Sequence, residues 1–190
     1  MQELIRLLDF LYRLSGPERD ELLAAWKPVS CPKGHFLVPE ERVCNHIFFI
    51  TKGVARIFYY KHDREVTEWL ALDNSMFFSI RSFFERVPTH LIIQLLEDSE
   101  LLAIHHDELI RLCDRYHEVE KLFRRIITGS LLLSQIRMES IQFETAQQRY
   151  ERLIRDRPDI VQRVPLGYIA SYLGITQETL SRIRAQGRNM

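Results

Sequence analysis

A glycine between two short helical patterns, near the end of the chain, is the feature that most restricts the fold. Before it, Ile169 and Leu173 recur at helical spacing and give one helix an inner face. Gly174 supplies the left-handed residue that ends a helix and turns the chain. Thr176 can cap a second helix, whose inner face begins at Leu180. The pattern predicts a helix-turn-helix.

The polar side chains of the second helix match the chemistry of base and phosphate recognition. Arginine can bond guanine with two hydrogen bonds, glutamine suits adenine, glutamate accepts from cytosine, and serine or threonine can hold a phosphate. We therefore expect a DNA-binding surface on this helix. Its predicted residues are Thr176, Gln177, Glu178, Ser181, Arg182 and Arg184. Helix-turn-helix pairs also occur as plain structural elements, so a packing role stays open.

The distribution of charge fits a DNA-binding end better than a uniformly basic protein. The 26 basic residues equal the 26 acidic ones in number, which argues against indiscriminate coating of nucleic acid or membrane. From residue 137 onward, nine arginines face six acidic residues. A basic end on a neutral body suits a DNA-binding appendage, although so small a bias also fits a solvated surface.

Short runs of β-branched and aromatic residues fill the chain from Val29 to Ile104, with turn-forming residues between them. This spacing predicts many short strands, and hence a β-sandwich or barrel. The clearest runs are residues 46–50 and 54–60, which we interpret as a hairpin that turns at Gly53. Helical spacing precedes this region, first in residues 4–12 and then up to Trp26.

A long helix is predicted from about His117 to about Ile141. Apolar residues follow spacings of three and four along it, the heptad pattern of a helix that pairs with its own copy. The predicted dimer interface consists of Val119, Phe123, Ile126, Ser130 and Leu133. Leu122, Ile127 and Leu131 lie off this seam and can pack on the chain's own β-domain. A single broad stripe buried in one core is the alternative.

The order of these elements resembles the Crp/Fnr superfamily of bacterial transcription regulators. Residues 169–183 are similar to the family's recognition pattern of a glycine, a small cap and then Arg-Glu-Thr-x-x-Arg. By that match Gln177, Glu178 and Arg182 fall at the three principal base-reading positions, with Gln177 in place of the commoner arginine. Residues 33–56 are similar to part of the family's β-roll.

The resemblance implies an α+β fold. An antiparallel, jelly-roll-like β-roll with flanking helices is expected in residues 1–113, a dimerisation helix in 114–143 and a helix-turn-helix domain in 144–190. Family members usually follow the recognition helix with a β-hairpin wing, but only residues 185–190 follow it here. We therefore expect no wing, weak affinity of the monomer for DNA, and strong dependence on dimerisation and low salt.

The resemblance also implies an effector pocket in the β-roll. Cyclic-nucleotide binders of the family hold the ribose with a glutamate and the phosphate with an arginine. Here Ile80 stands at the position of the acid, His90 at that of the arginine, and Leu91 at that of the small hydroxyl residue or alanine that follows the arginine in the family. Burying a phosphate without a cation is costly, so we expect no physiological binding of cyclic AMP. Arg81 or Arg86 can hold another anion instead, or both can be solvated while aromatic residues fill the pocket.

Enzyme chemistry has the least support in the sequence. The one dense group of potential metal ligands, residues 105–108, does not place two histidines on one helical face, so a capped and solvated helix start is expected. Cys31, Cys44 and Cys113 lack the spacing of a metal site or a disulfide framework. We expect no catalytic residue, no metal and no cofactor.

The function expected from sequence and resemblance is that of a homodimeric, DNA-binding transcription regulator of the bacterial cytoplasm. No stretch approaches the roughly 18 apolar residues of a membrane helix, and the start lacks the pattern of a secretory signal. The implied partners are double-stranded operator DNA, a second copy, RNA polymerase, and an unknown small-molecule effector or none. The alternative is a small-ligand binding module whose terminal helices only assist packing.

Overall fold

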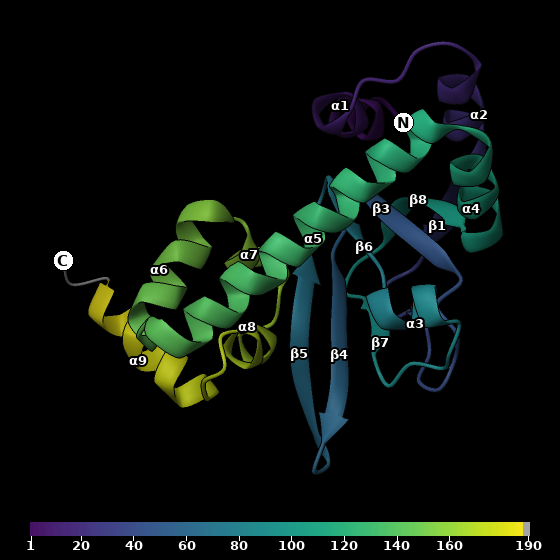
Figure 1. Ribbon diagram of the computed structural model, residues 1–190. Helices are drawn as coiled ribbons and strands as arrows, with labels where there is room; N and C mark the ends of the chain where they lie inside the picture. Colours follow the sequence, from purple (N-terminus) through teal and green to yellow (C-terminus); the bar gives the residue numbers. More distant parts are fainter. Residues whose placement is uncertain (188–190) are drawn as a thin grey trace.

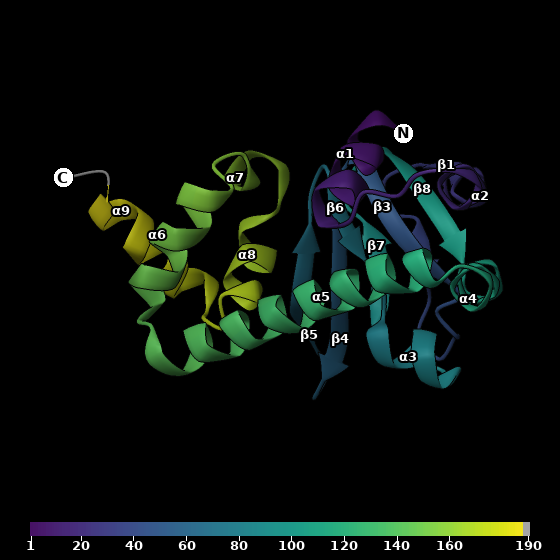
Figure 2. The ribbon, with the colours of Figure 1, turned by 45° about the horizontal axis from the view of Figure 1, so that its top comes forward.

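The computed structural model describes residues 1–187 and has an α+β fold with a β-roll at one end and a helical unit at the other. Figure 1 shows the long helix α5 (His117–Phe143) running across the molecule from the roll to the helical unit. The same arrangement is clear in Figure 2, where α5 passes along one side of the strands. The predicted fold class and the predicted long helix are confirmed.

The described strands form two four-stranded antiparallel sheets. The first sheet has the order β1 (Lys27–Cys31), β8 (Ser99–His105), β3 (His46–Lys52) and β6 (Ser75–Phe77). The second has the order β2 (Phe36–Val38), β7 (Ile92–Leu95), β4 (Ala55–Lys61) and β5 (Arg64–Ala71). The two sheets bury their apolar side chains between them, which is the usual way for antiparallel sheets to form a core.

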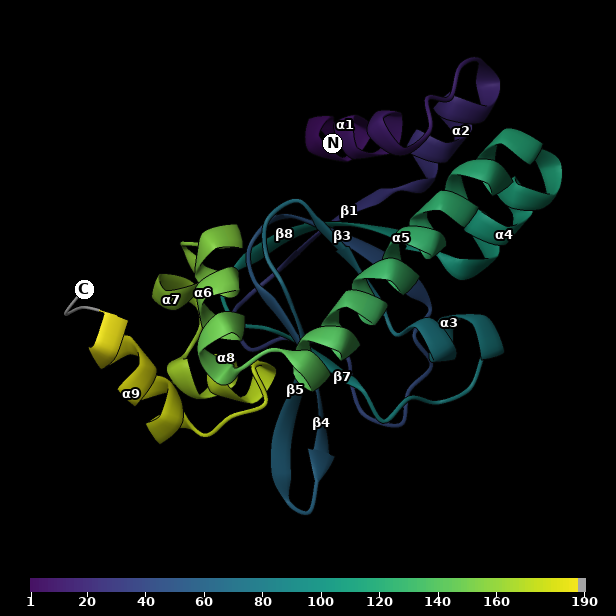
Figure 3. The ribbon, with the colours of Figure 1, turned by 60° about the vertical axis from the view of Figure 1, so that its left-hand side comes forward.

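Helices surround the roll and build the opposite end of the molecule. The roll carries α1 (Gln2–Leu11), α2 (Pro17–Ala25), α3 (Ile80–Glu85) and α4 (His106–Arg115). After α5 come α6 (Ala146–Asp156), α7 (Ile160–Arg163), α8 (Leu166–Tyr172) and α9 (Gln177–Gly187). Figure 3 shows these last four helices gathered together, away from α1, α2 and α4. Within residues 1–187, no helix is both long enough and apolar enough to cross a membrane.

The hairpin predicted across Gly53 is wrong, because β3 and β4 belong to different sheets. Gly53 sits where the chain passes from one sheet to the other, with φ of 134°. The true hairpin joins β4 to β5 through a tight turn at His62 and Asp63, both left-handed, as such turns require. Both β3 and β4 have long buried runs, so the pattern alone did not show which neighbours they pair with.

A second cluster of buried apolar residues joins the helical unit to the roll. The roll contributes Val54, Leu70 and Leu72. The helical unit contributes Ile160, Val164, Ile169, Ala170, Leu173 and Leu180. Because the two ends share this cluster, the helices of the tail are packed against the roll and do not extend freely into solvent.

Candidate DNA-binding surface and effector pocket

The turn between α8 and α9 has the geometry that the sequence predicts. Gly174 has φ of 70°, and the next amide, that of Ile175, donates to the carbonyl of Ala170 at 3.0 Å. Thr176 caps α9, because its hydroxyl accepts from the amide of Thr179 at 3.2 Å. Leu180 is fully buried against α8 and the second cluster. The predicted turn, cap and inner face are thus present.

The polar residues of α9 lie on its outer side. Thr176, Gln177, Glu178, Ser181 and Arg182 are exposed, whereas Arg184 is half-buried. The guanidinium of Arg182 donates to the hydroxyl of Thr179 at 3.3 Å. Hydrogen bonds from its own backbone amide and from Thr176 lower the pKa of Glu178, so this side chain is a carboxylate near neutral pH. The exposed row therefore presents a cation, an anion and an amide together.

Gln177 lies close to the first turn of α8. Its amide oxygen is so close to Gly167 that a Cβ at the glycine would lie 3.0 Å away. A glycine in the first turn of α8 thus leaves room for the first side chain of α9. The sequence analysis did not single out Gly167, because its spacing to Gln177 has no local signal.

The predicted dimer seam is wrong at Val119. This side chain is only 1% exposed and belongs to the core of the roll, so it cannot meet a partner. Phe123 and Ile126 also pack against that core. Ser130 is half-buried, and its hydroxyl donates to the carbonyl of Ile126 at 3.1 Å. Leu133 alone of the five has a largely exposed side chain. The heptad spacing predicts a seam toward a partner, but Val119, Phe123 and Ile126 pack against the core of their own chain.

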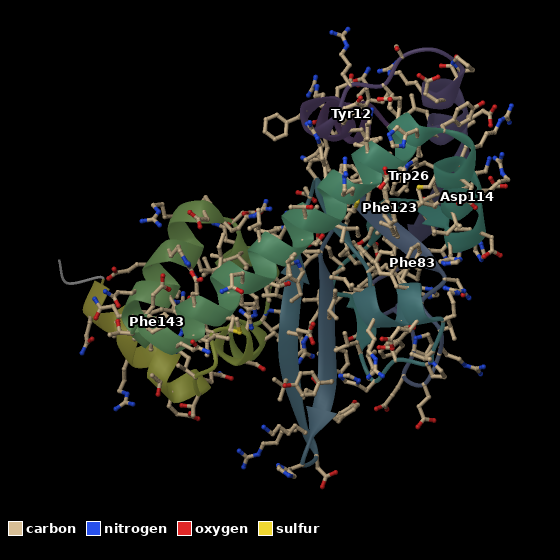
Figure 4. The ribbon with its side chains drawn as sticks, in the orientation of Figure 1. Tyr12, Trp26, Phe83, Asp114, Phe123 and Phe143 are labelled. Carbon is tan, nitrogen blue, oxygen red and sulfur yellow. The ribbon has the colours of Figure 1, made fainter. Side chains whose placement is uncertain are left out.

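The second half of α5 carries the exposed apolar surface. Its members are Leu131, Leu132, Leu133, Ile136, Met138, Ile141 and Phe143. Figure 4 shows the contrast between the two halves, with Phe123 beside the roll and Phe143 at the far end among the helices of the tail. Phe143 is 79% exposed. So many exposed apolar side chains on one helix are unusual for a surface that faces only water.

A cavity of about 600 Å³ lies between the roll and α5. All four predicted pocket residues, Ile80, Arg81, His90 and Leu91, line it. Arg81 does not provide a free cation, because its guanidinium pairs with Glu85 at 2.7 Å and its side chain is 76% exposed. Of the two interpretations of this arginine, the geometry favours the solvated one over the anion-holding one.

Arg86 turns away from the cavity. Its guanidinium donates to the side chain of Asn45 and to the carbonyls of Cys44 and Phe83. The residue has φ of 56° and ends α3 in the left-handed conformation. It therefore holds the end of a helix, and it does not line the cavity.

Two hydroxyl groups that the sequence analysis missed form the buried polar part of the cavity wall. Ser79 and Thr89 each precede a predicted residue by one position, and their oxygens lie 3.0 Å apart. Both side chains are buried, and the amide of Leu91 donates to Thr89 at 2.9 Å. Their only sequence signal was the presence of small hydroxyl residues among aromatic ones. A satisfied hydroxyl pair carries no charge to offer a phosphate.

Glu68 lines the cavity from β5 with its side chain exposed to solvent, and the sequence did not reveal it. Partial desolvation by the cavity wall raises the pKa of its carboxyl, while His90 and Arg137 act in the opposite direction. The rings of His90 and Tyr59 meet edge to face at 5.8 Å. No hydrogen bond or ion pair from any described residue reaches the Glu68 carboxyl in this structure.

Two buried or half-buried arginines join the helical unit to the roll. Arg163 binds Asp73 at 2.7 Å and Glu97 at 2.5 Å. Arg56 is almost fully buried in β4, and its guanidinium lies 3.6 Å from the centre of the Tyr168 ring. These contacts have no local signal in the sequence, because each one joins residues that are far apart along the chain.

Further contacts tie α8 to its surroundings. The hydroxyl of Ser171 accepts from the amide of Thr67 in β5 at 2.8 Å. Arg137 of α5 stacks on the Tyr172 ring at 4.0 Å and donates to its carbonyl at 2.8 Å. The first helix of the helix-turn-helix is therefore held by both the roll and the long helix.

The histidine group at residues 105–108 marks a helix start, as expected. The ring of His105 accepts from the amide of Asp107 at 3.2 Å and caps α4. The ring of His106 packs edge to face against Phe83 at 5.0 Å. Across the described part of the chain, no three His, Cys, Asp or Glu side chains are grouped so that they can hold a metal.

Comparison with known proteins places the roll in a recognised domain family. Residues 28–116 match the family described as the cyclic nucleotide-binding domain. No curated protein sequence matches the chain. The family match covers the β-roll and α4, and it ends where α5 begins.

Solved structures extend the similarity to most of the chain. FixK2 from Bradyrhizobium japonicum aligns with a TM-score of 0.72 at 19% identity, over 86% of this chain and 85% of that one. CLP, a c-di-GMP responsive global regulator from Xanthomonas campestris, aligns with a TM-score of 0.64 at 15% identity, over 90% and 91%. The catabolite activator protein of Thermus thermophilus aligns with a TM-score of 0.57 at 18% identity, over 93% and 84%. At these identities the similarity is one of fold, and this is the fold that the resemblance in the sequence implies.

Proposed function

We propose that this chain, which has the fold of the Crp/Fnr regulators, is a homodimeric, sequence-specific DNA-binding transcription regulator. The observation that carries the proposal is the exposed polar row on α9, opposite the buried Leu180 and after the capped turn at Gly174. A recognition helix needs such a row free of contacts with its own protein, so that it can enter the major groove.

Base reading is assigned to Gln177, Glu178 and Arg182. Glu178 and Arg182 are four residues apart and so share a side of the helix, and Gln177 adjoins them at its start. Arginine and glutamine can each make two hydrogen bonds to one base edge, while a carboxylate accepts from cytosine. Thr176, Ser181 and Arg184 are assigned to phosphate and neighbouring groups.

Dimerisation is assigned to the second half of α5, beyond the part that covers the roll. Leu132, Ile136 and Phe143 belong to the exposed apolar set on this half. A second copy that buries this set brings two helix-turn-helix units together. Two copies suit a palindromic operator, whose half-sites follow the two-fold symmetry of the protein.

The cavity is assigned to an effector other than cyclic AMP. A cyclic phosphate needs a fixed cation, and Arg81, the arginine that lines the cavity, is paired with Glu85 and mostly solvated. The walls offer instead the neutral pair of Ser79 and Thr89 and the acid Glu68. The domain thus keeps the β-roll of the cyclic nucleotide-binding family without its chemistry for phosphate.

The test is selection of binding sites from random double-stranded DNA, followed by titration of the enriched sequence. We expect a palindromic motif. Arg182→Ala should lower affinity for it by about 10- to 100-fold, the usual value of a good base contact, with the fold intact. Arg155→Ala is the matched control, because Arg155 is an exposed arginine of α6 outside the row. Equal affinity of Arg182→Ala and wild type contradicts the assignment.

The second candidate function is a ligand-binding module whose terminal helices only assist packing. The shared cluster of Leu70, Ile160 and Leu180 favours it, because the tail contributes to the same core as the roll. The selection experiment separates the two functions. A module of this kind enriches no DNA motif, and its Arg182→Ala variant behaves as wild type.

A further inference from the structure

The cavity between the roll and α5 is lined by large apolar side chains. Trp69, Met76 and Phe78 come from the roll and the segment that leads to α3, and Phe84 comes from α3 itself. Leu133 closes the cavity from α5, together with two serines. Apolar and aromatic side chains that share a cavity with polar groups are typical of sites for small organic molecules.

The charged groups of the cavity leave one acid without a partner. Arg81 and Glu85 neutralise each other, at 2.7 Å. His90 is held against Tyr59. Arg137, the other cation whose charge acts on Glu68, stacks on Tyr172 and donates to its carbonyl. Glu68 is exposed and has no ion pair with any described residue, so its carboxylate is accessible to a ligand in the cavity.

A β-bulge explains why Glu68 reaches the cavity at all. Ile57 pairs with Trp69, but the next residue of β4, Phe58, pairs with Thr67, so Glu68 is the extra residue of β5. Neighbouring residues of a regular strand point to opposite faces. A bulge breaks this alternation and re-aims a side chain, and bulges are frequent next to functional sites. Here it lets Glu68 and Trp69 line the same cavity.

We propose that the cavity binds an organic amine, a molecule with an apolar or aromatic body and a protonated amino group that pairs with Glu68. The inference rests on the proposed function, in which this cavity holds the effector. The body of the ligand replaces water against Phe78, Phe84 and Leu133. The ammonium group gains a charge-assisted hydrogen bond with the carboxylate of Glu68.

The charged groups that line the cavity determine which charge the ligand should carry. A carboxylate or phosphate group would meet Glu68 with like charge and without a free cation, which disfavours anions. A neutral molecule of the same shape would fill the apolar part but leave the acid unpaired. Amine, alcohol and carboxylate of one carbon skeleton should therefore bind in that order.

The test uses three probes with one phenyl body, namely phenethylamine, 2-phenylethanol and phenylacetate, each titrated calorimetrically into the full chain at pH 8 without DNA. We expect phenethylamine to bind at least ten-fold more tightly than 2-phenylethanol, and phenylacetate to give no saturable binding. Glu68→Gln should remove the preference for the amine but keep binding of the alcohol. Glu100→Gln, a change of an exposed acid on β8, should leave all three results as they are.

Three results overturn the proposal. They are equal binding of amine and alcohol, an unchanged preference in Glu68→Gln, and no saturable binding of any probe. Circular dichroism of each variant shows that the fold is kept. Because the titrations contain no DNA, their failure leaves the DNA selection result standing. If the selection enriches no DNA motif but the chain binds the amine through Glu68, the proposed regulator function is contradicted and the proposed class of ligand is not.

Discussion

Arg163 donates hydrogen bonds to both carboxylate oxygens of Asp73, at 2.7 Å and 3.0 Å, although 90 residues separate the two in the sequence. The same guanidinium reaches Glu97, Asp159 and the carbonyl of Gly53. Asp73 in turn accepts from the amide of Gly53 at 2.7 Å. One arginine of the helical unit thus binds two acids of the roll, Asp73 and Glu97, and one acid of its own unit, Asp159.

Replacing Arg163 with methionine should lower the free energy of unfolding by about 2 to 4 kcal/mol. Removing one partner of a fully buried ion pair costs about 3 to 5 kcal/mol, and this arginine is partly exposed. Urea unfolding at neutral pH measures the change. Arg155→Met, at an exposed position of α6, should change stability by less than about 0.5 kcal/mol. A similar effect of both variants contradicts a special role for Arg163.

Acid should weaken the same contact. Hydrogen bonding from Arg163 lowers the pKa of Asp73 in the folded protein. A carboxyl with a lowered pKa stabilises the fold at pH values above its ordinary pKa of about 3.9, and this stabilisation is lost as the pH falls through the lowered value. The difference in stability between wild type and Asp73→Asn should therefore be full at pH 6 and shrink steadily below the ordinary pKa. Thermal unfolding across this range checks it, and a constant difference contradicts it.

Two glycines should respond to alanine in opposite directions. At Gly53 a Cβ would lie 2.1 Å from the hydroxyl of Ser99, and φ is 134°, so Gly53→Ala should cost more than about 2 kcal/mol. At Gly129, inside α5, a Cβ meets nothing within 4 Å. Gly129→Ala should therefore stabilise the protein by about 0.5 to 1 kcal/mol. Denaturant titration measures the change in stability of both variants. A Gly129→Ala variant that is less stable than wild type contradicts the inference that a Cβ fits at this position.

The two halves of α5 should differ in what their substitutions disturb. Leu122 is buried in the roll, so Leu122→Ala should cost about 2 to 4 kcal/mol of stability. Ile136 is 50% exposed, so Ile136→Asp should keep the fold but shift the protein from dimer to monomer. Sedimentation equilibrium and urea unfolding together separate the effects. A dimer that survives Ile136→Asp contradicts the assignment of the interface to this half.

Local features were predictable from the sequence, whereas partners across the chain were not. The turn at Gly174 and the cap at Thr176 depend on residues within one helical turn, and both are present. The pairing of β3 and β4 depends on distant strands, and there the predicted hairpin is wrong. Val119 follows the heptad spacing of an interface, but this spacing does not distinguish a residue in the core of its own chain from one that contacts a partner.

The predicted site residues show the same contrast between local features and contacts across the chain. Exposure of Gln177 and Arg182 follows from the period of α9, because Leu180 takes the inner face. Ile80 and His90 line the cavity, whereas Glu68 lines it from the position of a β-bulge. A bulge is a mismatch between two strands, so it cannot be read from one strand alone.

Leu133, on the wall of the cavity, and Arg137, stacked on Tyr172, lie one turn apart on α5. The 27 residues of this helix make a stiff rod about 40 Å long. Residues four positions apart share a side of a helix. A ligand that displaces Leu133 would therefore also disturb the contact between Arg137 and Tyr172 one turn further along, and with it the packing of α8 against the long helix.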